Sequence, residues 1–200
     1  MILRRTVLLI VALAMLPKVS RAQRAERPAE IEAVLVHPFM ARPFVCREHF
    51  EGQLEYLFDA LGTDCVILVN GREYRTDGKT NEDYYIWGRE VLAPFDAVVT
   101  RVMQNEIINE PGVLGKSPPG LILFRRADSV DVMYAHLDSI RVAVGDTVRA
   151  GQPVASVSNN GMSRAPHVHI GARRGPHPLQ IRWDLRAMGE LMRQLEASPR

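Results

Sequence analysis

Two histidines, His167 and His169, stand two positions apart in the short apolar run Pro166–Ile170. Side chains at positions i and i+2 of a β-strand leave it on the same face, with Cα atoms roughly 6.6 Å apart. One imidazole ring can then bind a metal ion while the other contacts a water molecule bound to that metal. A polar strand that carries two histidines by chance is the alternative, so the pair needs support from other residues.

The sequence around this pair consists mainly of short β-rich runs separated by turn residues, which predicts a mainly β fold. Asn70-Gly71 separates residues 65–69 from 72–75 and indicates a hairpin with a type I′ turn. A second hairpin is predicted from residues 121–124 and 130–134. Further strands are expected at residues 90–93, 97–102, 141–144, 147–149 and 152–157. This close spacing of short strands and turns is typical of an antiparallel β-sandwich or barrel-sandwich hybrid core.

Two other segments complete the predicted architecture. Residues 104–119 contain three prolines and two glycines, so we expect a long loop at the rim of a cleft. Apolar residues recur at helical spacing near the C-terminus, which predicts one amphipathic helix packed on the sheet. These residues are Leu185, Met188, Leu191, Met192 and Leu195.

The N-terminal residues have the pattern of a secretory signal. Two arginines precede the apolar run 6–16, which is too short to span a bilayer comfortably, and the small-residue pattern Ser20-Arg21-Ala22 follows. We expect residues 1–22 to be a cleaved signal peptide, 23–33 a flexible lead-in and 34–200 a single domain. An uncleaved N-terminal anchor is the alternative. Either arrangement predicts an extracytoplasmic domain, periplasmic or secreted, and signal cleavage leaves no stable membrane insertion.

Removal of the signal changes the sign of the net charge. The full chain has 25 basic and 23 acidic residues, and four basic residues but no acidic ones lie in 1–22, which leaves a net charge of −2. No clustered basic surface remains, which argues against a nucleic-acid partner. Cys46 and Cys65 would lie in an oxidising compartment, so we expect a disulfide between them. Two buried free thiols are the alternative.

Several motifs follow one another along the chain. They are Trp87–Pro94, Tyr134–Ile140, Val144–Gln152, Asn159–Ser163 and Pro166–His169. With this combination the chain resembles the lysostaphin/LytM-type zinc endopeptidases, whose fold is the duplicated hybrid motif. The resemblance implies a zinc ion held by two histidines and one aspartate. It also implies that the substrate is a peptide of bacterial peptidoglycan.

The resemblance assigns roles to three histidines. His169 is the implied zinc ligand, while His167 and His136 are the implied catalytic pair. A hydrolytic zinc needs three protein ligands and an open position for a water molecule, whose pKa it lowers toward about 7. One nearby imidazole can then take the proton of that water, and another can donate to the developing oxyanion. Which of His136 and His167 does which stays open.

The other two ligands depart from the commonest pattern of the family, in which a histidine and an aspartate four residues apart shortly precede a Gly-x-x-Val strand. Asp83 lies five residues before Gly88, but the position four before Asp83 is Lys79, which cannot serve as the histidine. The usual position for the first two ligands is therefore not filled.

A subgroup of the family places the histidine upstream of a Gln-x-x-Tyr-x-x-Asp segment, and the stretch from His49 to Asp59 resembles that arrangement. The resemblance then implies His49, Asp59 and His169 as the metal ligands, with an insertion at about residues 60–86. Glu51, Glu55 and Asp83 are competing carboxylates. Two further histidines precede prolines and are expected at the surface, His37, which is the fallback ligand, and His177.

The leading hypothesis is a zinc metalloendopeptidase that hydrolyses peptide cross-links of peptidoglycan, with zinc-bound water as the nucleophile and histidine as general acid and base. A degenerate, non-catalytic domain that binds or activates a cell-wall hydrolase is the alternative, and its partner protein is unknown. A third interpretation is a carrier of biotin or lipoate, suggested by residues 91–94 and 144–152. Such carriers need a lysine at a hairpin tip, and neither Lys79 nor Lys116 lies in such a turn.

Overall fold

The computed structural model describes residues 31–49, 59–116 and 118–197. The chain divides into two units, Met1–Glu30 and Ile31–Arg200, and the described residues all belong to the second. The predicted signal peptide and nearly all of the predicted lead-in therefore lie outside the described residues. Within the described ranges, no helix is both long enough and apolar enough to cross a membrane.

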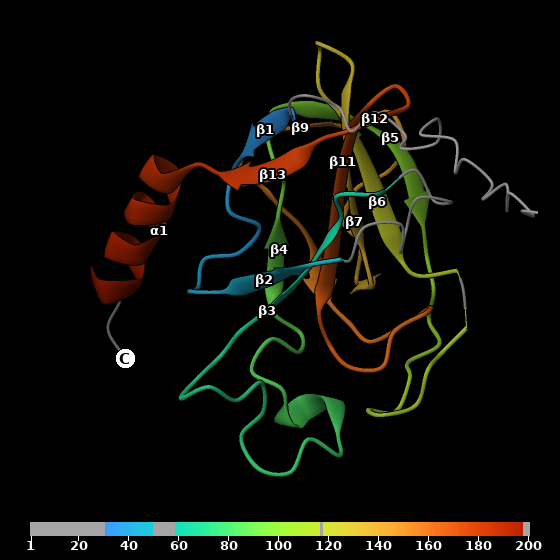
Figure 1. Cartoon of the computed structure of the whole chain (residues 1–200), viewed down its shortest axis with the longest axis vertical. Coiled ribbons are helices and arrows are strands. Elements are labelled where there is room, and N and C mark those ends of the chain that lie inside the picture. The colour runs from blue at the N-terminus through green and yellow to red at the C-terminus, as the bar shows by residue number, and fades with distance from the viewer. Residues whose placement is uncertain (1–30, 50–58, 117, 198–200) are drawn as a thin grey trace, which may run out of the picture. The chain divides into compact units, whose positions relative to one another are not determined.

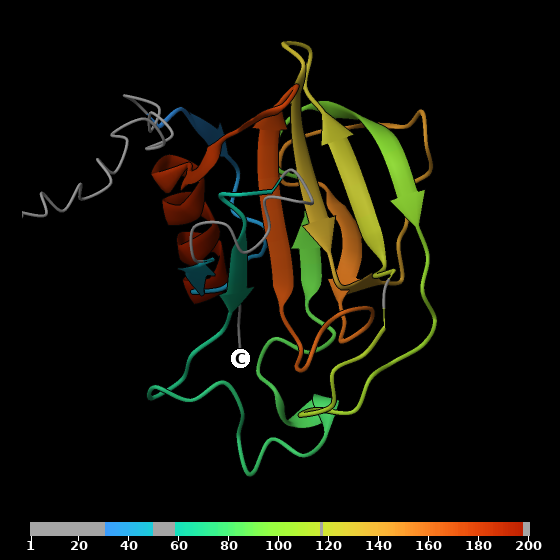
Figure 2. The ribbon, with the colours of Figure 1, turned by 45° about the vertical axis from the view of Figure 1, so that its right-hand side comes forward.

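The largest element is an antiparallel β-sheet in which β12 pairs with β11 and the other strands follow the order β2-β3-β11-β7-β6-β5-β9 (Figures 1 and 2). Its strands are β2 (Val45–Glu48), β3 (Thr63–Val66), β5 (Ala97–Met103), β6 (Leu121–Arg125), β7 (Val130–Ala135), β9 (Thr147–Val148), β11 (Val168–Arg174) and β12 (His177–Pro178). Strand β11 thus lies between two strands that are remote from it in sequence. This placement of β11 brings two residues that are 105 positions apart in the sequence into contact.

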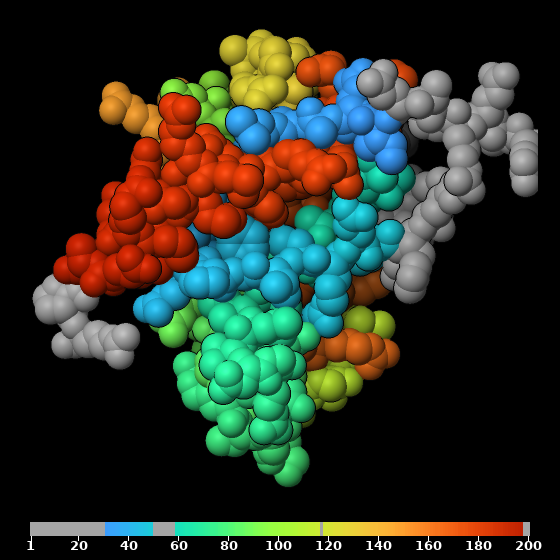
Figure 3. All heavy atoms as spheres, turned by 60° about the vertical axis from the view of Figure 1, so that its left-hand side comes forward, coloured from blue at the N-terminus to red at the C-terminus, as the bar shows by residue number. Residues whose placement is uncertain are grey.

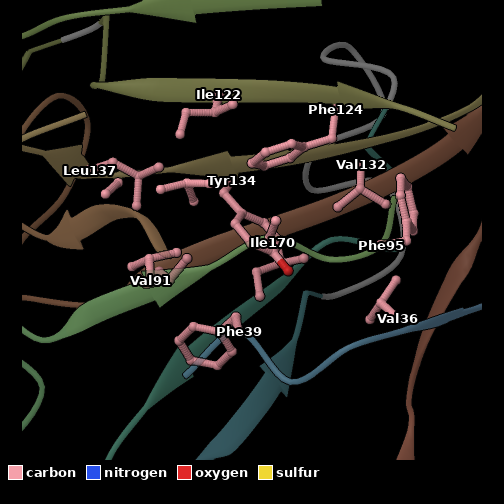
Figure 4. Packing of buried hydrophobic residues seen from close by; sticks show 14 of the residues in the cluster. Val36, Phe39, Val91, Phe95, Ile122, Phe124, Val132, Tyr134, Leu137 and Ile170 are labelled. Carbon is pink, nitrogen blue, oxygen red and sulfur yellow. The ribbon is translucent and has the colours of Figure 1, made fainter. Parts of the chain in front are cut away.

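Behind this sheet lies a smaller antiparallel sheet of β4 (Glu90–Leu92), β10 (Pro153–Val157) and β8 (Leu137–Asp138) (Figure 2). Alternate side chains of the large sheet point toward it, and the apolar core fills the space between (Figure 4). Fully buried residues of this core include Phe124, Tyr134, Ile170, Val91 and Leu137. A separate parallel pair is formed by β1 (Ala33–Val36) and β13 (Gln180–Trp183). The fold is therefore mainly β, as predicted.

The predicted turn at Asn70-Gly71 and the second predicted hairpin are confirmed, but residues 72–75 form no strand and pair with the residues before the turn only in the bridge between Val69 and Arg72. Asn70 and Gly71 have φ angles of 51° and 76°, and Val69 and Arg72 exchange backbone hydrogen bonds of 3.0 and 3.1 Å, which defines a type I′ turn. Strands β6 and β7 form the second hairpin. The strand expected at residues 141–144 is absent from the described structure. There the Asp146 carboxylate accepts a hydrogen bond from the Ala143 N–H, which makes this stretch part of a turn.

The segment between β3 and β4 extends to one end of the domain, where Figures 1 and 3 show it in green. It contains one 3-10 turn, η2 (Asn81–Asp83). The Asp83 carboxylate accepts hydrogen bonds from the backbone N–H groups of Thr76 and Gly78 at 2.9 and 2.6 Å, so it holds this loop together. Strand β3 belongs to the central sheet, although it lies within the insertion expected at about 60–86.

The predicted C-terminal helix is confirmed as α1 (Leu185–Ala197), but it does not lie flat on the sheet. None of its residues is buried, and Leu185 is 75% exposed. Leu185 and Met188 instead line a cavity of about 480 Å³ together with residues of β2, β3 and β13. The helix therefore flanks the edge of the fold and takes no part in the main core.

Candidate metal centre

The two strands β7 and β11 bring the three predicted histidines of the C-terminal half together. His169 pairs with Ala135, the last residue of β7, and His136 follows directly. His167 immediately precedes β11. The rings of His136 and His167 have centroids 4.4 Å apart, and those of His136 and His169 are 6.4 Å apart. The strand ladder therefore groups them at one end of the sheet.

On the other side of β11, strand β3 places a carboxylate directly opposite His169. This residue is Asp64, the cross-strand partner of His169 in the antiparallel ladder. Side chains at paired positions lie on the same face, with Cβ atoms about 4.5–5.5 Å apart. Strand β2 pairs with β3 and ends at Glu48, and the N–H of the next residue, His49, donates to the Gly62 carbonyl at 3.2 Å. His49 is thereby turned toward the same face.

Three side-chain atoms from these strands converge. Asp64 Oδ1 lies 3.3 Å from His49 Nε2 and 2.9 Å from His169 Nδ1, and the two histidine nitrogens are 3.4 Å apart. Ligands at roughly 2.0–2.1 Å from a tetrahedral zinc ion are separated by roughly 3.3–3.4 Å. The donor types and their spacing therefore fit a zinc ion held by His49, Asp64 and His169, with a fourth position left for water.

Asp59, which the sequence predicted as a ligand, lies on the opposite side of the His169 ring. Its Oδ2 is 2.5 Å from His169 Nε2, whereas the donor cluster contains His169 Nδ1. Two glycines make room for this carboxylate, since a Cβ atom at Gly171 would collide with Asp59 Oδ1 and one at Gly62 would lie 2.7 Å from Oδ2. A carboxylate on the second nitrogen of a metal-binding histidine fixes the orientation of its ring. The geometry favours that role for Asp59.

The two other histidines have their rings anchored through Nδ1. His136 Nδ1 lies 2.7 Å from the Asn160 carbonyl oxygen, and His167 Nδ1 lies 2.8 Å from the Ala165 carbonyl oxygen. Because a carbonyl oxygen can only accept, both Nδ1 atoms carry the hydrogen. The Nε2 atoms of both rings are therefore available for proton transfer. His167 Nε2 is 3.4 Å from Asp64 Oδ1.

The electrostatics of the site separate His136 from His169. Burial, assisted by repulsion from His167, lowers the pKa of His136 to about 3, so this ring is neutral at pH 7. Burial also lowers the pKa of His169, but the hydrogen bonds and charges of Asp59 and Asp64 outweigh it and raise the pKa to about 9. Burial raises the pKa of Asp64, yet hydrogen bonds from His167 and His169 hold it well below its usual range. The two carboxylates beside His169 therefore favour a positive charge at the donor cluster.

The remaining predicted residues lie elsewhere. His37 Nδ1 donates to the Pro38 carbonyl and its ring lies against Gly151, while His177 is exposed on β12. Asp83 stabilises its own loop, and Glu51 and Glu55 lie outside the described residues. The structure thus brings neither histidine into the cluster.

The predicted disulfide between Cys46 and Cys65 is confirmed, and it joins paired positions of β2 and β3. From this pair of cysteines, Asp64 could have been identified in the sequence as a neighbour of His49. A cross-link between Cys46 and Cys65 places the residues after Cys46 beside those before Cys65 if the strands are antiparallel. His49 and Asp64 are then close neighbours.

A cavity of about 140 Å³ lies on the same face of the sheet as the donor cluster, and Asp59 and Gly171 are part of its lining. Apolar side chains of β6 and β7, including Leu123 and Met133, form part of its lining, together with Arg101. The cavity therefore offers both apolar and charged groups next to the candidate metal centre.

The family profile of peptidase family M23 matches residues 83–181, which contain His136, His167 and His169. The chain belongs to peptidase family M23. This M23 domain is 36% identical over 58 residues to the DD-carboxypeptidase/endopeptidase Mpg of Neisseria meningitidis serogroup B, which is 29% of this chain and 13% of the relative. It is 30% identical over 98 residues to an uncharacterized metalloprotease of Haemophilus influenzae, which is 48% of this chain and 19% of that protein.

Among solved structures, the M23 domain is similar to the catalytic domain of the antimicrobial peptidase lysostaphin from Staphylococcus simulans. The sequence identity is 20% and the TM-score is 0.40, and the match covers 60% of this chain and 76% of that domain. The matched regions span less than a fifth of the length of these two curated relatives. Their whole activities therefore do not transfer directly to this M23 domain.

Proposed function

We propose that this M23 domain is a zinc-dependent endopeptidase that hydrolyses peptide cross-links of bacterial peptidoglycan. The observation that carries the proposal is the convergence of His49, Asp64 and His169 beside two histidines that are not part of the donor set. In this proposal those three residues hold the zinc ion. Asp59 takes the role of orienting His169, in place of the ligand role expected from the sequence.

A zinc ion bound here would lower the pKa of a water molecule toward about 7 and polarise the peptide carbonyl. The chain itself supplies the proton transfers. His136 is neutral and its Nε2 can accept the proton of the attacking water. His167, whose Nε2 lies next to Asp64, can donate to the developing oxyanion or to the leaving amine once it is protonated.

The substrate and the location are part of the proposal. Peptidoglycan peptides are the expected substrate because of the resemblance to lysostaphin-type enzymes, and the name of the Neisseria relative, a DD-carboxypeptidase/endopeptidase, is in line with that expectation. The signal-like residues 1–22 and the disulfide Cys46–Cys65 both favour an extracytoplasmic, oxidising compartment. We expect the mature domain to act there without stable membrane insertion.

The test is zinc analysis combined with release of fragments from purified sacculi. The wild-type protein should bind one zinc ion and release peptide-containing fragments, and chelation should abolish release until zinc is restored. His136→Ala should retain zinc and lose at least about 100-fold in rate, whereas His169→Ala should lose both zinc and activity. Mass spectrometry of the fragments identifies the bond that is cleaved.

The non-catalytic alternative depended on the departure of His49 and Asp59 from the commonest pattern of the family. The convergence of His49, Asp64 and His169 supports the catalytic hypothesis over this alternative. That alternative remains the outcome if wild-type protein with a full complement of zinc releases nothing from sacculi.

A further inference from the structure

His136 has an unfavourable backbone conformation for a residue with a side chain. Its φ angle is 64°, in the left-handed region that non-glycine residues rarely adopt, at the junction between β7 and β8. Such a conformation is unfavourable and persists only where surrounding contacts impose it. Some group must therefore hold the backbone on each side of His136.

The Asn160 side chain does this with all of its hydrogen-bonding groups. Its Nδ2 donates to the carbonyl of Leu137, the residue after His136, at 2.7 Å, and to the Asn105 carbonyl at 3.2 Å. Its Oδ1 accepts from the Gly120 N–H at 2.9 Å, and the Gly120 carbonyl in turn accepts from the Leu137 N–H at 3.0 Å. Asn160 is fully buried, so water cannot replace these bonds.

The main chain of the same residue also holds the ring of His136. The Asn160 carbonyl oxygen accepts from His136 Nδ1 at 2.7 Å, and the Ser158 N–H donates to the His136 carbonyl at 2.9 Å. The backbone and the ring of His136 are thus held by Ser158 and Asn160. Because a carbonyl accepts only, the hydrogen is fixed on Nδ1 and Nε2 is left as an acceptor.

We propose that Asn160 is a positioning residue for hydrolysis: it holds the left-handed backbone at His136 and selects the ring tautomer that presents Nε2 as the proton acceptor. This inference rests on the proposed function, because it assigns His136 to the reaction. It goes further by naming the residue on which the geometry and tautomer of that histidine depend.

The neighbouring Asn159 offers a matched control. It is also an asparagine and fully buried, but its Nδ2 donates to Asn81 Oδ1 at 2.9 Å and to the Asn109 carbonyl at 3.2 Å. These contacts join Asn159 to the segment between β3 and β4 and to the loop 104–119, and they do not involve the residues next to His136. Loss of a buried amide at either position should reduce stability, whereas only loss at 160 should act on His136.

The experiment compares Asn160→Ala with Asn159→Ala for zinc content, kcat, KM and the protonation of His136. Asn160→Ala should retain zinc and lose about 10- to 100-fold in kcat with KM within about threefold, because misplacing a catalytic group by about 1 Å can cost about 100-fold. Asn159→Ala should keep kcat within about threefold. Equal losses of kcat in the two variants, or an unchanged kcat in Asn160→Ala, would overturn the proposal.

A measurement on the wild type keeps the proposal testable even if Asn160→Ala does not fold. Nitrogen-15 NMR of the zinc-loaded protein, with the signals of His136 assigned by the variant His136→Ala, should show the hydrogen on Nδ1. A hydrogen on Nε2 contradicts the proposal. This readout does not require activity, so a wild-type protein that fails to cleave sacculi overturns the proposed function while the tautomer at His136 is still measured.

Discussion

The two halves of the candidate metal centre are built from different parts of the same sheet. The inner half, His136, His167 and His169, lies at the ends of β7 and β11, which pair along six positions in the middle of the sheet. The edge half consists of His49, which directly follows β2, and Asp64 on β3, and these two short strands lie at one edge of the sheet. Strand β3 pairs with β11 at only three positions.

The two halves are supported in different ways. In the edge half, the disulfide Cys46–Cys65 ties β2 to β3. In the inner half, Asp59 contacts the far side of the His169 ring within a space left by two glycines. The proposed catalytic histidines His136 and His167 therefore depend on the core ladder, whereas two of the three proposed zinc ligands depend on a cross-linked edge. Changes at the edge should therefore reduce zinc binding and leave the geometry of His136 and His167 largely intact.

The largest effect should come from the edge carboxylate itself. Asp64→Ala removes one of three proposed zinc ligands and should weaken zinc binding on the order of 1000-fold, measured by competition with a chromogenic chelator. Asp59→Ala should weaken it only about 10- to 100-fold, as loss of an orienting carboxylate does. The reverse order would restore Asp59 as the ligand that the sequence predicted.

Loss of the disulfide should come next. The double variant Cys46→Ser with Cys65→Ser should lower the free energy of unfolding by about 3 kcal/mol, because the cross-link closes a loop of 19 residues. Denaturant unfolding of the zinc-free protein measures this loss. Once the variant is saturated with zinc, its kcat should lie close to that of the wild type. A large loss of kcat at saturating zinc would mean that the inner half also depends on the edge.

A smaller effect is expected from the space in which Asp59 lies. Gly171→Ala places a methyl group against the Asp59 carboxylate, the nearest group to a Cβ atom there, and should weaken zinc binding about 10- to 100-fold. In a background of Asp59→Ala the same change should have little further effect on zinc affinity. Full additivity of the two substitutions contradicts the coupling between Gly171 and Asp59.

The smallest effect should arise far from both halves, at the type I′ turn. Gly71 has a φ angle of 76°, and a Cβ atom added there would meet no other atom within 4 Å, so Gly71→Ala tests backbone conformation alone. We expect a loss of about 1–2 kcal/mol in unfolding free energy, with zinc affinity and kcat unchanged. A change in zinc affinity would show that the segment between β3 and β4 is coupled to the metal centre.

Much of the fold could be predicted because strand alternation and turn residues are local properties. The turn at Asn70-Gly71 and the hairpin of β6 and β7 follow from neighbouring residues, whereas the strand expected at residues 72–75 does not form. The strand predicted at residues 141–144 is wrong. The apolar alternation there resembles a strand, but the Asp146 side chain holds Ala143 in a turn. The helix α1 forms where the apolar spacing predicted it, but that spacing could not reveal that the helix lies at an edge.

By itself, the sequence determined the inner half of the site, because His167 and His169 share a face through strand periodicity and His136 belongs to a recognisable motif. Only the tertiary structure decided that Asp64 joins His49 and His169 while Asp59 binds the other nitrogen of His169. The physical reason is register. The partner of His169 is set by the β3–β11 ladder across 105 residues of chain, and a shift of one residue would turn Asp64 to the other face.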